Sequence, residues 1–409
     1  MTELTPNLAR NIIERAHMGN PPIHGIEHYT AGLDPYLNVI EKEYLQTYIK
    51  DGGSTFKAVI AGYGEGKTHL LFSVQNLAWK HNYASSYVML SPVETPFHDP
   101  ERVYRALVKN LAYPPEGEKN PIIGIENFIR HWYVQKKAEF AMLEEREQVQ
   151  ALMDYANSIS GFENVSFARA VRQAFISLVI GHDADFEDIM VWLKGEGYDR
   201  KTHSKHGIMH KVDKSQAFPL IRSVSQWVSW VGYSGLLILF DEAEQVPSFS
   251  TKQKEILLSN LRQLIDECGD SFKHVFIMYS FPDEQFLMSR GVVYEALKQR
   301  LDTIFGFVNP TGVKIRLDEL PMDPKQILVE IGTKLARIYE VAYNHKFETS
   351  KTDQTVRNIA DVCIKRKIAG AHRRLFVRSL ITALHQMKSN PAIMIDLEKA
   401  EEIVSGVPR

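Results

Sequence analysis

Apolar residues are distributed along the chain in two patterns that point to two kinds of element. Residues 56–60, 236–240 and 274–280 are short, almost continuously apolar runs, which are typical of strands buried on both faces of a parallel sheet. In residues 69–77 and 324–341 apolar side chains instead recur at i, i+3 and i+4, the spacing of an amphipathic helix. The alternation of the two patterns predicts an α/β fold with a mostly parallel sheet.

Helical periodicity also dominates two longer parts of the chain, residues 125–193 and 318–387. We predict a sheet domain over residues 1–320, interrupted by a helical insertion at about 115–215, and a C-terminal helical lid over 321–409. Smaller elements predicted from the same patterns are a strand at 86–90 and helices at 8–16 and 252–266. The side chains predicted to form the core of the insertion are Trp132, Phe140, Leu143, Phe167, Phe175 and Leu178.

The link between the first strand and the next helix carries a phosphate-binding pattern. Residues 61–68 read Ala-Gly-Tyr-Gly-Glu-Gly-Lys-Thr, which is the P-loop motif with Ala61 in place of its first glycine. Closely spaced glycines let backbone N–H groups turn inward around a phosphate, and the following helix N-terminus adds partial positive charge. We expect Lys67 to reach the β- and γ-phosphates and Thr68 to bind Mg²⁺. The predicted nucleotide-binding residues are Gly62, Tyr63, Gly64, Glu65, Gly66, Lys67, Thr68 and His69.

A second motif follows the apolar run at 236–240, which ends in Asp241 and Glu242. Carboxylates at the C-terminal end of a parallel strand face the crevice in which open α/β sheets bind their ligands. We therefore expect Asp241 to hold Mg²⁺, directly or through water, and Glu242 to orient and deprotonate an attacking water. Two motifs in this order predict an ATPase of the P-loop class that uses ATP and Mg²⁺.

Three further positions resemble functional positions of AAA+ ATPases. Ser280 ends the third apolar strand, where that class carries a polar sensor, with Tyr279 as the alternative. Arg300 ends a helix-like segment and would contact the nucleotide of a neighbouring subunit as an arginine finger. Arg374, or Arg373 beside it, would be the lid arginine that senses the γ-phosphate. Each also has a plainer reading, as a turn-capping serine or as arginines on a helix surface.

The chain as a whole resembles the P-loop ATP-binding proteins of bacterial BREX-type phage-defence systems, in particular their small AAA+-like member. The resemblance implies an ATPase that works beside other defence proteins that recognise or modify DNA. It rests on a set of short segments that is specific in combination: 21–22, 25, 29–32, 62–70, 99–104, 192–196, 232–236, 241–244, 282–286 and 294–300.

Composition narrows the remaining possibilities. The 409 residues are 44% hydrophobic and 24% charged with a net charge of −2, so no global charge directs the protein to nucleic acid or to a membrane. Cys268 and Cys363 are the two cysteines and show no metal-binding spacing. The first residues lack a signal pattern, and the most apolar window, 227–240, is too short to span a bilayer. We expect a cytoplasmic protein.

Residues 197–214 form a basic stretch that could contact DNA. They hold Arg200, Lys201, Lys205, Lys211 and Lys214 and three histidines, His203, His206 and His210. The histidine spacing suggests metal, but no strong ligand such as cysteine accompanies them, so a mobile basic loop is the favoured interpretation. Contacts from such a loop to phosphates would give duplex DNA a sequence-independent affinity.

Other functions remain open at this point. The protein could be a nucleotide-dependent switch or assembly factor with negligible turnover, or a DNA-binding module that uses ATP only to load. A kinase is the weakest alternative, because the sequence contains no recognisable site for a small phosphoryl acceptor. If Arg300 acts in a neighbouring subunit, the protein is a homo-oligomer.

Residues 22–32, after the Pro21-Pro22 pair, would line the adenine base.

Overall fold

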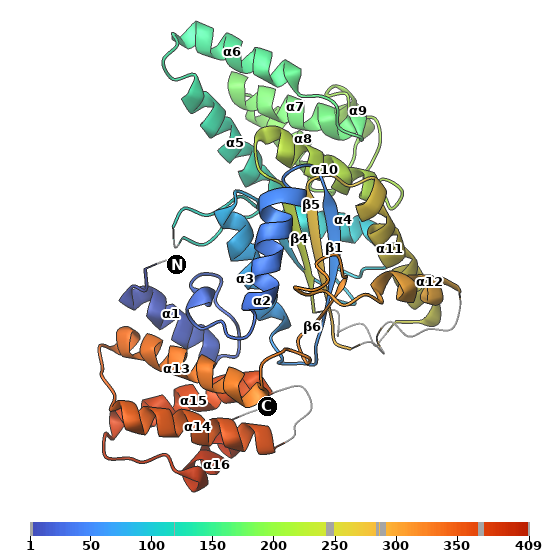
Figure 1. Ribbon diagram of the computed structural model, residues 1–409. Coiled ribbons are helices and arrows are strands. Elements are labelled where there is room, and N and C mark those ends of the chain that lie inside the picture. The colour runs from blue at the N-terminus through green and yellow to red at the C-terminus, as the bar shows by residue number, and fades with distance from the viewer. Residues whose placement is uncertain are drawn as a thin grey trace.

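A six-stranded, mostly parallel sheet forms the centre of the protein (Figure 1). The computed structural model describes residues 3–117, 119–242, 249–283, 286, 292–366 and 372–407. The strand order is β3-β2-β4-β5-β1-β6, and β3 alone pairs antiparallel to its neighbour. The predicted α/β sheet is thus confirmed. Its strands are β1 Ser54–Ile60, β2 Ala84–Met89, β3 Leu111–Ala112, β4 Leu236–Asp241, β5 Val275–Phe281 and β6 Lys314–Arg316.

Side chains of each central strand alternate between two apolar cores. Leu236, Ile238 and Phe240 of β4 face one core, whereas Leu237 and Leu239 face the other, as the two-residue period of a strand requires. Both faces are covered by helices, which explains why the strands read as continuous apolar runs. One face carries α4 Pro100–Lys109, α10 Ala217–Val231, α11 Thr251–Asp270 and α12 Val292–Leu301, and the other carries α2 Asp34–Val39, the π-helix η2 Ile40–Tyr48 and α3 Lys67–Lys80.

The helices between β3 and α10 form an insertion at the top of the sheet (Figure 1). They are α5 Ile125–Glu139, α6 Glu145–Ser158, α7 Val165–Ile180, α8 Asp183–Leu193 and α9 Arg200–Ser204. Of the predicted core side chains, Trp132, Phe167 and Phe175 are buried, while Phe140 and Leu178 are half-buried. The prediction for Leu143 was wrong: the residue lies in the link between α5 and α6 and is 41% exposed.

A second group of helices lies at the opposite end of the sheet from the insertion (Figure 1). It consists of α13 Pro324–Tyr343, α14 Thr349–Lys365, α15 His372–Ser389 and α16 Leu397–Gly406, together with the N-terminal helix α1 Pro6–His17. Leu8 and Ile12 of α1 share one apolar core with Leu335 of α13 and Leu380 of α15. We call these five helices the C-terminal bundle. The domain boundary at residue 320 stays a prediction, and α1 lies with the helices beyond it.

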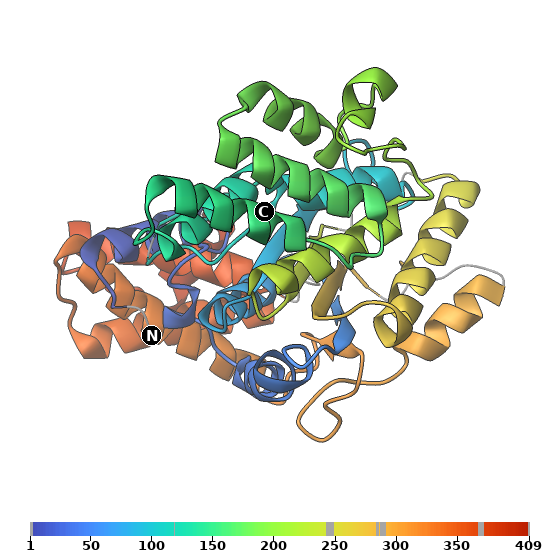
Figure 2. The same ribbon diagram turned by 90° about the horizontal axis from the view of Figure 1, so that it is seen from above.

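Viewed from above, the insertion helices cross over the sheet, and α11 and α12 lie on the side away from the C-terminal bundle (Figure 2). Within the part of the chain that the structure describes, no helix combines the length and the apolar character needed to cross a membrane.

Candidate functional site

The P-loop sequence forms the turn between β1 and α3. Gly64 and Gly66 have left-handed φ angles of 77° and 95°, which a side chain would strain. Gly62 does not share that conformation. Ala61 continues the pairing of β1, since its N–H donates to the Phe281 carbonyl over 3.3 Å. Position 61 therefore needs no glycine, which explains how alanine replaces the first glycine of the motif.

Lys67 points its side chain back under this turn. The residue is buried, and its ammonium donates to the carbonyls of Ala61 and Gly62 over 3.0 and 3.2 Å. The loop thus holds a positive charge beside backbone N–H groups at a helix N-terminus, the combination that binds anions.

Asp241 is the centre of a cluster of hydroxyl donors. Its carboxylate, 1% exposed, accepts hydrogen bonds from Thr68 over 2.6 Å, Tyr87 over 2.9 Å and Ser280 over 2.5 Å. The arrangement follows from the strand order: β5 lies between β1 and β4, so the ends of all three strands meet at one edge. A carboxylate and a hydroxyl in contact provide the oxygen ligands that Mg²⁺ prefers, so this pair fits the predicted metal.

Glu242 follows β4 in a left-handed conformation, with φ 61°, which is uncommon for a residue other than glycine. Its half-buried side chain lines the same cavity as Lys67 and Thr68. The two acidic residues thus have different positions. Asp241 is enclosed by hydroxyls, whereas Glu242 faces the cavity. Such outliers concentrate at functional sites.

The cavity beside the P-loop has a volume of about 500 Å³, within the range of small-molecule sites. Its charged and polar lining includes the P-loop, Glu242, the arginines of α15 and Arg15 of α1. The lining also includes small and apolar residues from α1, the segment after it, α3, α13 and α15: Ala16, Ala31, Leu33, Phe72, Ile331 and Val377. The cavity therefore offers polar groups to phosphates and apolar contacts to a ring.

Arg373 connects α15 to the P-loop. Its guanidinium donates to the carbonyl of Glu65 over 2.6 Å and to that of Leu317 over 3.0 Å, and it lies 3.8 Å from the Glu65 carboxylate. Burial lowers the pKa of Arg373, and the Glu65 carboxylate opposes this shift. Arg374 donates to the Tyr63 hydroxyl and lies over its ring at 5.2 Å. Both arginines line the cavity.

Comparison with protein families now identifies the chain. The family model described as BREX system ATP-binding protein BrxC/D matches residues 4–402. The chain belongs to this family. The predicted membership is thereby confirmed over nearly its whole length, and the description supports ATP as the ligand of a phage-defence protein. A search of curated proteins finds no match.

In this BrxC/D-family protein, His69 lies at the inner wall of the cavity. Its Nε2 is 2.8 Å from the Thr30 hydroxyl, and its ring packs edge-on against Tyr29. Burial, and then the charge of Arg373, lower the pKa of His69 to about 3, so the imidazole is neutral at physiological pH. The segment after the Pro21-Pro22 pair thus reaches the P-loop helix through Thr30.

Arg300 does not line the cavity. Its guanidinium pairs with Asp266 of α11, with Nη2 3.0 Å from Oδ2, and Nη1 donates to the Ala296 carbonyl over 2.8 Å. The structure thus brings together every predicted site residue except Arg300, whose action in a neighbouring subunit stays a prediction. Tyr87 and Arg15 are among the polar side chains of the cavity that sequence reasoning missed. Neither carries a motif, because each reaches the site only through the fold.

The basic segment at 197–214 is more ordered than the favoured loop interpretation implied. It contains α9, and His203 and His206 are buried. Lys205 pairs with Asp185 and Asp188, and Lys214 lies 3.3 Å from Asp99. Part of its positive charge is therefore already matched by acidic groups. Contact with DNA stays a prediction for Arg200, Lys201 and Lys211, which are exposed.

Proposed function

We propose that this BrxC/D-family protein is an AAA+-like ATPase that binds ATP with Mg²⁺ and hydrolyses it. The turnover would drive or switch a phage-defence complex that acts on DNA. The observation that carries the proposal is the contact between Thr68 and Asp241, 2.6 Å apart, at a cavity that also contains Lys67 and Glu242. A pair of metal-binding residues, a phosphate-binding lysine and a carboxylate that can activate water thus share one site.

Each residue has a defined task in this proposal. The backbone N–H groups of the P-loop and the Lys67 ammonium bind the phosphates. Thr68 and Asp241 would hold Mg²⁺, which when bound neutralises charge on the phosphate oxygens. Glu242 orients a water and accepts its proton. Ser280 fixes the Asp241 carboxylate from the opposite side, which keeps the second oxygen turned toward Thr68.

The C-terminal bundle would act as the lid. Arg373 and Arg374 approach the P-loop from α15, and either guanidinium can turn to a γ-phosphate. Ala16, Ile331 and Val377 of the bundle offer apolar contacts to a purine ring. Because the bundle supplies both groups, nucleotide binding would draw it toward the sheet.

Steady-state phosphate release tests the proposal. We expect Glu242→Gln to bind ATP with unchanged affinity and to release phosphate about 10²- to 10⁴-fold more slowly, the usual contribution of a general base. Lys67→Ala should instead weaken ATP binding itself. Glu255→Gln, the same substitution at an exposed position of α11, is the matched control and should match the wild type.

The outcomes separate hydrolysis from the alternatives. Wild-type release rates in Glu242→Gln would contradict the role given to this carboxylate. ATP binding without measurable release in the wild type would identify a nucleotide-dependent assembly switch or a DNA loader. The same assay tests the proposed partners, which are other proteins of the defence system and duplex DNA. A partner that affects ATP hydrolysis should change the rate of phosphate release when it is added.

A further inference from the structure

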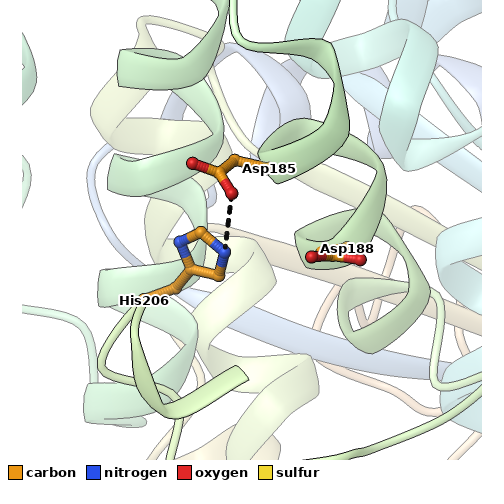
Figure 3. Close-up of side chains that lie close together, drawn as sticks. All are labelled: Asp185, Asp188 and His206. Atoms are coloured by element: carbon orange, nitrogen blue, oxygen red, sulfur yellow. Dashed lines mark ion pairs between the residues drawn. The ribbon is translucent and has the colours of Figure 1, made fainter. Parts of the chain in front are cut away.

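Two aspartates and a histidine meet in the helical insertion, far from the P-loop. Asp185 and Asp188 lie one turn apart on α8, and His206 follows α9 (Figure 3). One potential ligand atom from each residue lies within 4.8 Å of the others. His206 Nε2 and Asp185 Oδ1 are 3.6 Å apart. Two ligands of a single ion at about 2.0–2.2 Å can lie that far from one another.

His206 supplies a second, independent observation. The residue is 7% exposed, and among the described residues no hydrogen-bond partner lies within reach of its Nε2. A buried polar atom without a partner is costly, and native structures rarely contain one without a reason. Figure 3 shows this ring nitrogen directed toward the carboxylate of Asp185.

The orientation of Asp185 is fixed from its other side. His182 Nδ1 lies 2.9 Å from Asp185 Oδ2, so Oδ1 is the oxygen that faces His206. Metal-binding side chains are commonly oriented by such outer partners. The pair of histidines therefore gives the two oxygens of Asp185 different tasks.

Lys205 shows that a cation can occupy this place. Its ammonium lies 2.9 Å from Asp185 Oδ1 and 3.2 Å from Asp188 Oδ2, while its side chain is 49% exposed. The ammonium neutralises the two carboxylates but leaves Nε2 of His206 without a hydrogen bond. Because half of the side chain is in solvent, Lys205 can swing outward without disturbing the packing of α8.

We propose that Asp185, Asp188 and His206 bind one divalent transition-metal ion of the Zn²⁺ class, which displaces the Lys205 ammonium. Two carboxylate oxygens and an imidazole nitrogen form a ligand set suited to Zn²⁺ and its neighbours, with water completing the coordination. The ion clamps the segment after α9 onto α8 and turns Lys205 to the surface. This proposal is independent of the proposed ATPase function.

Metal binding by the full-length, nucleotide-free protein tests the site. Zn²⁺ is followed by calorimetry and Co²⁺ by its visible absorption, with excess Mg²⁺ present to compete at Thr68 and Asp241. Because loss of an outer partner alone costs about 10- to 100-fold in affinity, Asp185→Asn and Asp188→Asn should each weaken binding by at least about tenfold. Lys205→Gln should tighten it, because the competing ammonium is gone.

Glu187→Gln is the matched control, since it removes an exposed charge from the same helix between the two ligands and should leave the affinity unchanged. These variants avoid altering the buried imidazole, so all of them should fold. Binding that is equal in Asp188→Asn and the wild type would place the ion elsewhere and overturn the proposal. Absence of saturable binding in both the wild type and Lys205→Gln would also overturn the proposal. In that case the Lys205 ammonium alone would neutralise the two carboxylates.

Discussion

At the scale of single residues, the environment of Asp241 explains how a carboxylate is kept in a nearly dry position. Three hydroxyls donate to its two oxygens, and hydrogen bonds to a charged acceptor are about twice as strong as neutral ones. One of these hydroxyls belongs to Tyr87 of β2, which lies outside the P-loop motif in the sequence. Its hydroxyl therefore has the task of holding the acid, while the residue also lines the cavity.

Tyr87→Phe tests that task. Removal of the hydroxyl leaves the Asp241 carboxylate one donor short, so we expect the free energy of unfolding to fall by about 1.5–3 kcal/mol. Urea denaturation measures the change. Tyr48→Phe removes a hydroxyl from a tyrosine that is 51% exposed and should alter stability little. Equal unfolding free energies for the two variants would show that the bond from Tyr87 to Asp241 contributes nothing.

Lys57 is a second buried charge, and it lies within β1 itself. The residue is 1% exposed, and its ammonium donates to the Tyr44 hydroxyl over 2.8 Å and to the Gly312 carbonyl over 2.7 Å. Burial lowers the pKa of Lys57 to about 7. The unfolded chain, with its ordinary lysine pKa, therefore binds more protons than the folded protein between about pH 7 and pH 10.

From this difference we expect the wild type to gain stability as the pH rises above about 7, by at most about 1.4 kcal/mol per pH unit. Below that pH both states carry the proton, and the dependence on Lys57 disappears. Lys57→Met should lose this rise. The informative quantity is the difference in unfolding free energy between the two proteins from pH 6 to pH 9.5, because other groups cancel. Parallel profiles would contradict the lowered pKa.

At the scale of elements, the first turn of α15 contacts the P-loop through three consecutive side chains, those of His372, Arg373 and Arg374. Arg373 bridges Glu65 of the P-loop and Leu317, the residue that follows β6. The neighbouring Arg374 contacts Tyr63 instead. The C-terminal bundle therefore contacts the P-loop through adjacent residues with different partners.

Arg373→Ala should loosen this connection. Each of its two charge-assisted hydrogen bonds contributes about 1.5–3 kcal/mol, so we expect faster amide hydrogen exchange in residues 61–68 and in α15, and weaker ATP binding. Arg374→Ala keeps both carbonyl bonds and serves as the comparison, with little change in exchange without nucleotide. If the two variants exchange alike, the bundle is held by its apolar contacts alone.

Much of this sheet could be predicted from local patterns. A continuous apolar run that ends in carboxylates identifies a buried parallel strand and the edge of its crevice, which predicts Asp241, whereas Ser280 was predicted from its likeness to the sensor position of AAA+ ATPases. The same reasoning worked for the P-loop, because its glycines and its lysine are neighbours in sequence. Buried helices such as α7 were visible from their apolar spacing.

Contacts between distant segments could not be predicted in this way. Tyr87, Asp266 and the aspartates of α8 carry no signal of their own, and their partners lie on other elements. The interpretation of residues 197–214 was the least accurate. The sequence shows the basic residues and histidines of this segment but not the carboxylates of Asp99, Asp185 and Asp188, which the fold places beside them. The prediction that Leu143 is buried was wrong for a different reason. The apolar spacing of the helix continues past the end of α5, although the chain turns there before α6 begins.

At the scale of the whole molecule, Arg300 raises the question of subunit assembly. It lies on α12, on the side of the sheet away from the C-terminal bundle (Figure 2), and pairs with Asp266 within the chain. Because Arg300 does not line the cavity of its own chain, we expect any nucleotide that it contacts to belong to a second copy. The pairing has two readings: a surface ion pair of little consequence, or a resting position for a finger.

Mixing of inactive subunits distinguishes the readings. An arginine finger contributes about 10³- to 10⁵-fold to turnover, so we expect Arg300→Ala and Glu242→Gln to be nearly inactive alone. In a mixture, one interface combines the intact Glu242 of the first variant with the intact Arg300 of the second. Phosphate release should therefore return on mixing. Asp266→Asn breaks the same ion pair but keeps the guanidinium, and it should remain active. If Asp266→Asn instead loses activity as Arg300→Ala does, and mixing restores nothing, then Arg300 only stabilises the packing of α12 on α11, and the case for a ring or dimer loses its catalytic basis.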